Sequence, residues 1–196
     1  MKSKFHGGIS GEGMRMSNVK LLVVAAMLVA LGVVFPMAFH MLPAGYAGRA
    51  LLPMHIPVLL AGLICGPFYG LVAGAITPAI SHLTTGMPMQ AVMHSMVFEL
   101  GMYGLVAGLV MKFVRTSRTS FDLYIALVSA MLAGRIFAGI IQAFFLFDGT
   151  YAIGMWVSAY FSFALPGIVI QLAFIPSVVM ALERERLIPL RYPIQA

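Results

Sequence analysis

Two charged residues interrupt long apolar stretches of this 196-residue sequence and are the first candidates for chemistry. Glu99 follows the run AVMHSMVF, and Arg135 follows ALVSAMLAG. Helical rise places Glu99 about 13 Å and Arg135 about 16 Å from the outer ends of their predicted spans, so the two side chains lie at a similar depth in the membrane. Ionisable side chains are costly inside a membrane and are functional candidates by default. Two interpretations stay open: an ion pair that holds two helices in register, and ligand binding by at least one member.

Polar and aromatic residues recur at helical spacing near these charges. The pairs are Arg135 with Gln142, Glu99 with Tyr103, and Trp156 with Tyr160. Residues four or seven apart lie on one face of a helix, so each pair can present two polar groups to a common site. Trp156 and Tyr160 also fit the aromatic belt at a membrane surface, and both interpretations remain open for them.

Four histidines map to the same outer half of the predicted spans. They are His40, His55, His82 and His94. Neutral imidazole is a ligand for Ni, Co, Cu and Zn, but the sequence has no HxxxH or HxH spacing, and Glu99 is the one candidate acid nearby. We therefore expect these side chains to contact a small molecule or the protein, and we expect no metal site.

The sequence contains no pattern typical of an enzyme. GxSxG, HExxH, paired-aspartate and P-loop motifs do not occur, so we expect no catalytic site and no cofactor. Cys65 is the single cysteine and cannot form an intrachain disulfide.

The composition predicts an all-α integral membrane protein. Hydrophobic residues make up 61% of the chain and charged residues 9%, with a mean hydropathy of +0.99. Apolar runs between polar or Gly/Pro breaks predict a six-transmembrane-helix bundle with spans near 19–39, 51–65, 67–85, 90–113, 121–146 and 155–182. The second span is short, because its 15 residues rise only about 22 Å against a hydrocarbon core of about 30 Å.

Basic residues predict the orientation of the bundle. With six spans and a turn at Gly66–Pro67, Arg49 is the one basic residue of the external connections, and the opposite side carries Lys2, Lys4, Arg15, Lys20, Lys112, Arg115, Arg118, Arg184, Arg186 and Arg191. The positive-inside rule then places both termini in the cytoplasm, with tails 1–18 and 183–196 flanking the membrane domain 19–182. The net charge of +6 is thus explained by topology, and we expect no nucleic-acid partner.

Small residues recur at four-residue spacing in several spans. The pairs are Ala26 and Ala30, Gly62 and Gly66, Gly70 and Gly74, and Gly104 and Gly108. Such spacing allows close approach of helix backbones in lipid.

Two segments carry a resemblance to a known family. The run ALLPMHIPVLLAGLICGPFYGLVAGAITP and the later FELGMYGLVAGL, together with the six predicted spans, resemble the substrate-binding S component of an energy-coupling factor (ECF) vitamin transporter. The resemblance extends from about Lys20 to Glu183. It implies a multi-pass protein of a prokaryotic plasma membrane that captures a vitamin or vitamin precursor outside the cell with high affinity. It also implies uptake driven by a transmembrane coupling (T) component and two cytoplasmic ATPases.

The resemblance assigns roles to particular residues. Ala26 and Ala30 resemble the AxxxA motif by which the first helix docks on the coupling component, and the 40–54 loop would act as a gate. The ligand region of the family corresponds here to Arg49, His55, His82, His94, Glu99, Arg135, Gln142 and Trp156.

The identity of the ligand stays open at this level. Arginine suits a carboxylate such as that of pantothenate, whereas Glu99 suits hydroxyls or a protonated ring nitrogen, so pantothenate, pyridoxine-like or thiamin-related compounds and a cobalamin precursor such as α-ribazole all fit. One alternative is a cobalt- or nickel-binding S component. In cobalt and nickel S components the MHIP motif forms the amino terminus of the chain. Here MHIP lies inside the chain, at residues 54–57. A second alternative is a membrane scaffold subunit without a small ligand.

Overall fold

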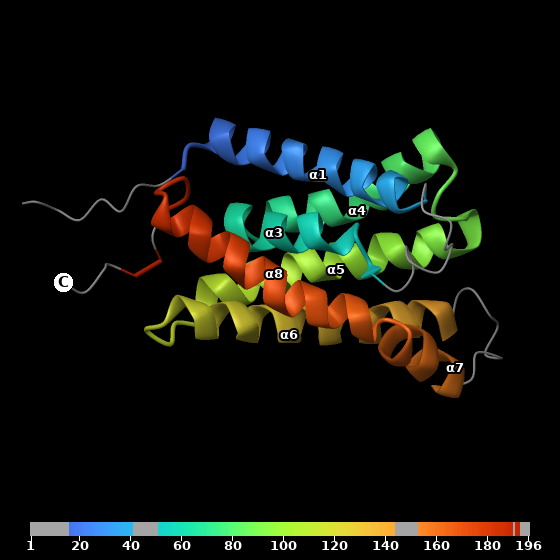
Figure 1. The fold of residues 1–196 in the computed structure, drawn as a ribbon. Helices are drawn as coiled ribbons and strands as arrows, with labels where there is room; N and C mark the ends of the chain where they lie inside the picture. The colour runs from blue at the N-terminus through green and yellow to red at the C-terminus, as the bar shows by residue number, and fades with distance from the viewer. Residues whose placement is uncertain (1–15, 41–50, 144–152, 190, 193–196) are drawn as a thin grey trace, which may run out of the picture.

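The computed structural model describes residues 16–40, 51–143, 153–189 and 191–192, and this part of the chain is helical and contains no strand. The elements, labelled as in Figure 1, are α1 (Asn18–His40), α3 (His55–Cys65), α4 (Pro67–Thr85), α5 (Gln90–Phe113), α6 (Thr119–Ile141), α7 (Ile153–Val157), the π-helix η2 (Ser158–Ser162) and α8 (Leu165–Arg184).

Four of the described helices are long and apolar enough to cross a membrane. They are α1, α5, α6 and α8. The structure therefore agrees with the predicted all-α membrane bundle, whereas the count of six spans and the cytoplasmic placement of both termini stay predictions.

The shortest of the predicted spans, α3, lies at the centre of the bundle. It packs against α1, α4, α5 and α8 and also touches α6 (Figure 1). Nearly every residue of α3 is buried, including Leu59 and Ala61 at 0% exposure. A helix that is apolar all round is stable when other helices surround it. The 11 residues of α3 therefore do not need to match the thickness of the bilayer against lipid.

Glycines allow the closest helix contacts of the bundle. A Cβ atom added at Gly104 of α5 would overlap the backbone of Gly70 in α4, and one added at Gly62 of α3 would overlap the carbonyl of Gly104. Helices in lipid gain packing energy where such small residues let their backbones meet. The predicted role in helix packing is confirmed for these glycines and for Gly74 and Gly108, whereas a Cβ at Gly66 would meet no atom within 4 Å.

The turn between α3 and α4 falls where the sequence predicted it. Gly66 has φ of +95°, a conformation that favours glycine, and Pro67 begins α4 at a position where its missing N–H leaves no bond unmade.

The last predicted span, 155–182, is wrong as a single helix. The structure divides this stretch into α7, η2 and α8, with a turn at Phe163 and Ala164. Pro166 lacks a backbone N–H and is tolerated in the first turn of a helix, so α8 begins anew beside it.

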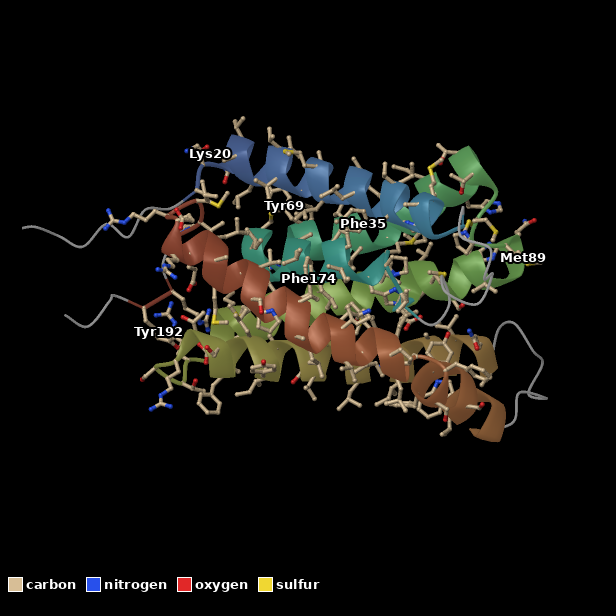
Figure 2. The ribbon with its side chains drawn as sticks, viewed as in Figure 1. Lys20, Phe35, Tyr69, Met89, Phe174 and Tyr192 are labelled. Carbon is tan, nitrogen blue, oxygen red and sulfur yellow. The ribbon has the colours of Figure 1, made fainter. Side chains whose placement is uncertain are left out.

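The chain after α8 folds back onto one end of the bundle. The Arg191 side chain donates to Asp122 in the first turn of α6 and to the carbonyls of Met111 and Val114 at the end of α5. Tyr192 also donates its hydroxyl to Asp122, at 2.6 Å. We call this group, Asp122 with Arg191 and Tyr192, the C-terminal clasp. Figure 2 shows Tyr192 at the same end of the molecule as Lys20, with Met89 at the opposite end.

Candidate functional site

The predicted site residues that the structure brings together lie around the start of α3, where this helix meets α5. His55 occupies the first turn of α3, and Glu99 lies on the facing helix α5. Their exposed fractions are 2% and 5%, and Arg135 on α6 is exposed by only 2%. Three ionisable side chains are thus buried within a mostly apolar bundle.

Tyr103 connects these helices. Its hydroxyl donates a hydrogen bond of 2.8 Å to Oε1 of Glu99, one helical turn earlier. The centroid of its ring lies 5.4 Å from that of His55. A Cβ at Gly134 of α6 would overlap the Tyr103 ring, so the ring packs on the α6 backbone directly before Arg135. Tyr103 of α5 therefore contacts both α3 and α6, the other two helices that carry these buried ionisable side chains.

Glu99 faces His55 and Tyr103. Its Oε1 lies 3.8 Å from Nε2 of His55, which is within ion-pair range but too long for a hydrogen bond. Among the described residues Asp122 pairs with Arg191, and His55–Glu99 is an ion pair only when the His55 ring is protonated. The structure therefore brings Glu99 and Arg135 to neighbouring positions without joining them in the ion pair that their shared depth allowed.

Arg135 lacks a full set of partners. Its Nη2 atom is buried and has no hydrogen-bond partner in the described part of the chain. The guanidinium carbon lies 5.6 Å from the centroid of the Phe161 ring of η2, within the range of a cation–π contact. A buried guanidinium with an unused N–H group is a strong donor for an anion or a carbonyl oxygen.

Trp156 and Gln142 complete the cluster on the side of α7 and η2. The indole Nε1 of Trp156 donates to the carbonyl of Arg135 at 3.2 Å, in space left open by Gly139. The Gln142 amide donates to the hydroxyl of Tyr160 at 2.7 Å. Both contacts join α6 to the irregular segment before α8. π-helical turns such as η2 are frequent at functional sites.

The histidines at the α4–α5 turn stand apart from this cluster in their hydrogen bonds. Nδ1 of His82 contacts the carbonyl of Pro88 at 2.8 Å, and Nδ1 of His94, on an exposed side chain, contacts that of Gln90 at 3.1 Å. The described residues link neither ring to Glu99 or Arg135, and the expected ligand role of both stays a prediction.

Some expected residues are not settled by the structure. Arg49 and most of the proposed 40–54 gate lie outside the described residues, as does the side chain of His40. Ala26 and Ala30 are exposed on α1, and their predicted docking role stays a prediction. In the described segments no group of three or more His, Cys, Asp or Glu side chains could hold a metal ion.

Two residues of the site were not expected from the sequence. Phe161 lies over Arg135, and Gln171 of α8 is fully buried, with its Nε2 donating to the carbonyl of Leu52 at 3.4 Å. Gln171 carried a usable signal, because a single amide in an otherwise apolar span needs a polar partner. Phe161 carried none, because its position over Arg135 depends on the path of η2.

The comparisons with known proteins assign the chain to a family. No curated protein and no solved structure matches it. The family model for the substrate-specific component of ECF transporters matches residues 20–179. Since this match spans most of the 196 residues, the protein belongs to the family of ECF transporter substrate-specific components and is a transport subunit.

Proposed function

We propose that this protein captures a vitamin or vitamin precursor at the buried cluster around Arg135 and delivers it to an ECF coupling module for uptake. The observation that carries the proposal is the buried Arg135 side chain, whose Nη2 atom has no hydrogen-bond partner among the residues that the structure describes. An ionised group in the membrane is costly unless a partner of opposite charge pairs with it. Glu99 already accepts a hydrogen bond from the Tyr103 hydroxyl. A bound ligand would supply the missing partner.

The chemistry of the cluster favours a ligand with an acceptor group, and a carboxylate fits best. Guanidinium matches a carboxylate in geometry and charge, so a compound such as pantothenate suits Arg135. Phe161 and Trp156 add aromatic surface for the apolar part of the ligand. Pyridoxine-like and thiamin-related compounds and α-ribazole lack this carboxylate and are the competitors to be tested.

The energy for uptake comes from partners in this proposal. A substrate-specific component works with the T component and ATPases of an ECF transporter, and its own task is binding. The exposed Ala26 and Ala30 on α1 would meet the coupling component, and the bundle would lie in a prokaryotic plasma membrane with its basic end in the cytoplasm.

Ligand identification tests this proposal directly. Mass spectrometry of the protein purified in mild detergent is expected to show a retained vitamin or precursor. Calorimetric titration of the stripped protein with pantothenate, pyridoxine, thiamin and α-ribazole then ranks the candidates. Absence of any retained or bound compound would refute the proposal, and stoichiometric cobalt or nickel in elemental analysis would replace it with metal transport.

Variants of Arg135 connect the ligand to this cluster. We expect Arg135→Lys to weaken binding of a carboxylate ligand roughly tenfold or more, because lysine keeps the charge but loses the bidentate geometry. Arg184→Gln, an exposed arginine at the end of α8, is the matched control and should bind as the wild type does. Equal affinities of the wild type and Arg135→Lys would exclude Arg135 from the site.

A further inference from the structure

Gln171 is the most deeply buried polar group of α8, and the described residues pair with only one end of its amide. The residue is 0% exposed, and Nε2 donates to the carbonyl of Leu52. Oε1 is buried and has no hydrogen-bond partner among the described residues. A buried acceptor without a donor is destabilising, so a group that donated to Oε1 would be bound favourably.

The contact with Leu52 places Gln171 beside His55. The same Leu52 carbonyl also accepts the backbone N–H of His55, at 3.1 Å, where α3 begins. The Gln171 amide and the His55 backbone therefore share one acceptor and are neighbours across the contact between α8 and α3. Leu52 itself has φ of +50°, so its carbonyl is held in an unusual direction.

The His55 ring presents a second unused atom. Nδ1 is buried without a hydrogen-bond partner in the described part of the chain, whereas Nε2 faces Glu99. In the neutral ring with its proton on Nε2, toward the carboxylate, Nδ1 is a bare acceptor. Gln171 thus offers one acceptor, the neutral His55 ring offers a second, and Nη2 of Arg135 offers a donor that no described residue uses.

Tyr103 links His55 to the part of α6 that carries Arg135, and the Leu52 carbonyl links His55 to Gln171. The Tyr103 ring lies against His55 on one side and against the α6 backbone beside Arg135 on the other. A ligand that satisfied all three atoms would need an acceptor at one end and a hydrogen-bond donor at the other.

We infer that Gln171 is a specificity-determining residue that, together with His55, selects substrates carrying a hydroxyl or amide N–H group in addition to the acceptor bound by Arg135. The inference rests on the proposed function and narrows its substrate class to hydroxylated or amide-bearing acids. Buried polar atoms built to pair with a substrate donor discriminate strongly against analogues that lack it, because the atoms are then left unpaired. Apolar acids of the same size would be rejected on this basis.

The test compares how strongly the wild-type protein and a full-length Gln171 variant discriminate among substrate analogues, as in a double-mutant cycle. Pantothenate, its analogue lacking both hydroxyls, and its analogue with an ester in place of the amide are titrated calorimetrically. The wild type should bind at least one analogue on the order of tenfold more weakly than pantothenate. In Gln171→Leu this difference in affinity should shrink toward none, because the variant lacks the Oε1 atom that would accept a hydrogen bond from the substrate.

A purely structural Gln171 predicts a different result. If the amide only held Leu52, or if a water occupied Oε1, Gln171→Leu would weaken all three compounds equally and leave their ratios unchanged; that outcome overturns the inference. Gln171→Met, closer in volume, repeats the cycle should the leucine variant unfold. Ser177→Ala is the matched control on α8, since its hydroxyl is exposed and bonded within its own helix.

Failure of the inference can be told apart from failure of the proposed function. Binding of pyridoxine and not of pantothenate by the wild type would overturn the inference, because pyridoxine is not an acid, and would leave vitamin capture standing. A retained compound with no O–H or N–H donor would overturn the inference and leave vitamin capture standing. Binding of no compound, with none retained, would refute the proposed function itself.

Discussion

At the scale of single residues, Glu99 is held by a partner that its helical spacing indicated, and Arg135 by one that the sequence did not reveal. Glu99 accepts the hydroxyl of Tyr103 and lies near His55, and Arg135 lies over Phe161. The two buried side chains therefore differ in how many of their polar atoms are hydrogen-bonded. Glu99 has a hydrogen-bond donor within its own helix, whereas Nη2 of Arg135 has no partner among the described residues, and we propose that a ligand pairs with it.

Removal of the Tyr103 hydroxyl should destabilise the bundle. Tyr103→Phe deprives the buried Glu99 carboxylate of its 2.8 Å hydrogen bond, and we expect a loss of about 1.5–3 kcal/mol in the free energy of unfolding, typical of hydrogen bonds to charged groups. Thermal unfolding in detergent measures the change. Tyr124→Phe, an exposed tyrosine on α6, is the control and should unfold as the wild type does. Equal unfolding of both variants would contradict the assigned role of Tyr103.

At the scale of helices, close backbone contacts bring the site together. The glycines of α3, α4 and α5 let these three helices meet backbone to backbone, which holds His55 of α3 against Glu99 and Tyr103 of α5. Larger side chains would separate the helices, and the buried polar groups of α3 and α5 would no longer be in contact.

A methyl group at this contact should therefore disrupt the bundle. In Gly104→Ala the added Cβ would overlap backbone atoms of Gly70, which cannot move aside as a side chain can, so we expect destabilisation of about 1–3 kcal/mol or more. Gly101→Ala on the same helix is the control, because its Cβ would lie 3.4 Å from a flexible Leu71 side chain. The midpoint of thermal unfolding distinguishes the two, and a smaller loss in Gly104→Ala than in Gly101→Ala would argue against backbone contact.

At the scale of the whole molecule, the C-terminal clasp ties three helices together at one end. Asp122 is fully buried and receives Arg191, Tyr192 and Thr116. Arg191 also satisfies carbonyls at the end of α5, which have no partner within their own helix. The clasp lies at the end of the bundle that carries Lys20, opposite to Met89 (Figure 2).

Breaking the clasp should lower stability through the loss of its charge pairing. Arg191→Gln leaves the Asp122 carboxylate buried without its cation, and we expect a loss of up to about 3–5 kcal/mol in the free energy of unfolding. Combining it with Asp122→Asn should cost less than the sum of the single changes, because both remove the same interaction. Arg184→Gln, exposed on α8, serves as the control. Additive effects in chemical denaturation would show that the two residues act independently.

The orientation in the membrane is testable with single cysteines. In a Cys65→Ala background, we expect Thr84→Cys, in the last turn of α4, to react with an impermeant maleimide added to intact cells. Ser117→Cys, between α5 and α6, should react only after the cells are permeabilised, since the positive-inside rule applied to Lys112, Arg115 and Arg118 predicts a cytoplasmic position for this turn. The reverse pattern of labelling would invert the proposed topology.

Much of the fold was predictable from the sequence, and the site was predictable only in part. Apolar runs and the Gly66–Pro67 turn located the helices to within a few residues, apart from the break at Phe163 and Ala164, where irregular turns leave the hydrophobic pattern unchanged. Burial cost identified Glu99 and Arg135. The same reasoning overlooked Gln171, although it is a lone amide in an apolar span.

The sequence by itself determined the class of protein, the family and the polar residues that lipid cannot accommodate. Helical periodicity gives a residue its depth and its face, but it does not say which neighbouring helix that face meets. The tertiary structure decided that Tyr103 rather than Arg135 satisfies Glu99, and that Gln171 meets the start of α3. The physical reason is that in lipid the rotation and partners of a helix are set by side-chain packing, which depends on the whole bundle at once.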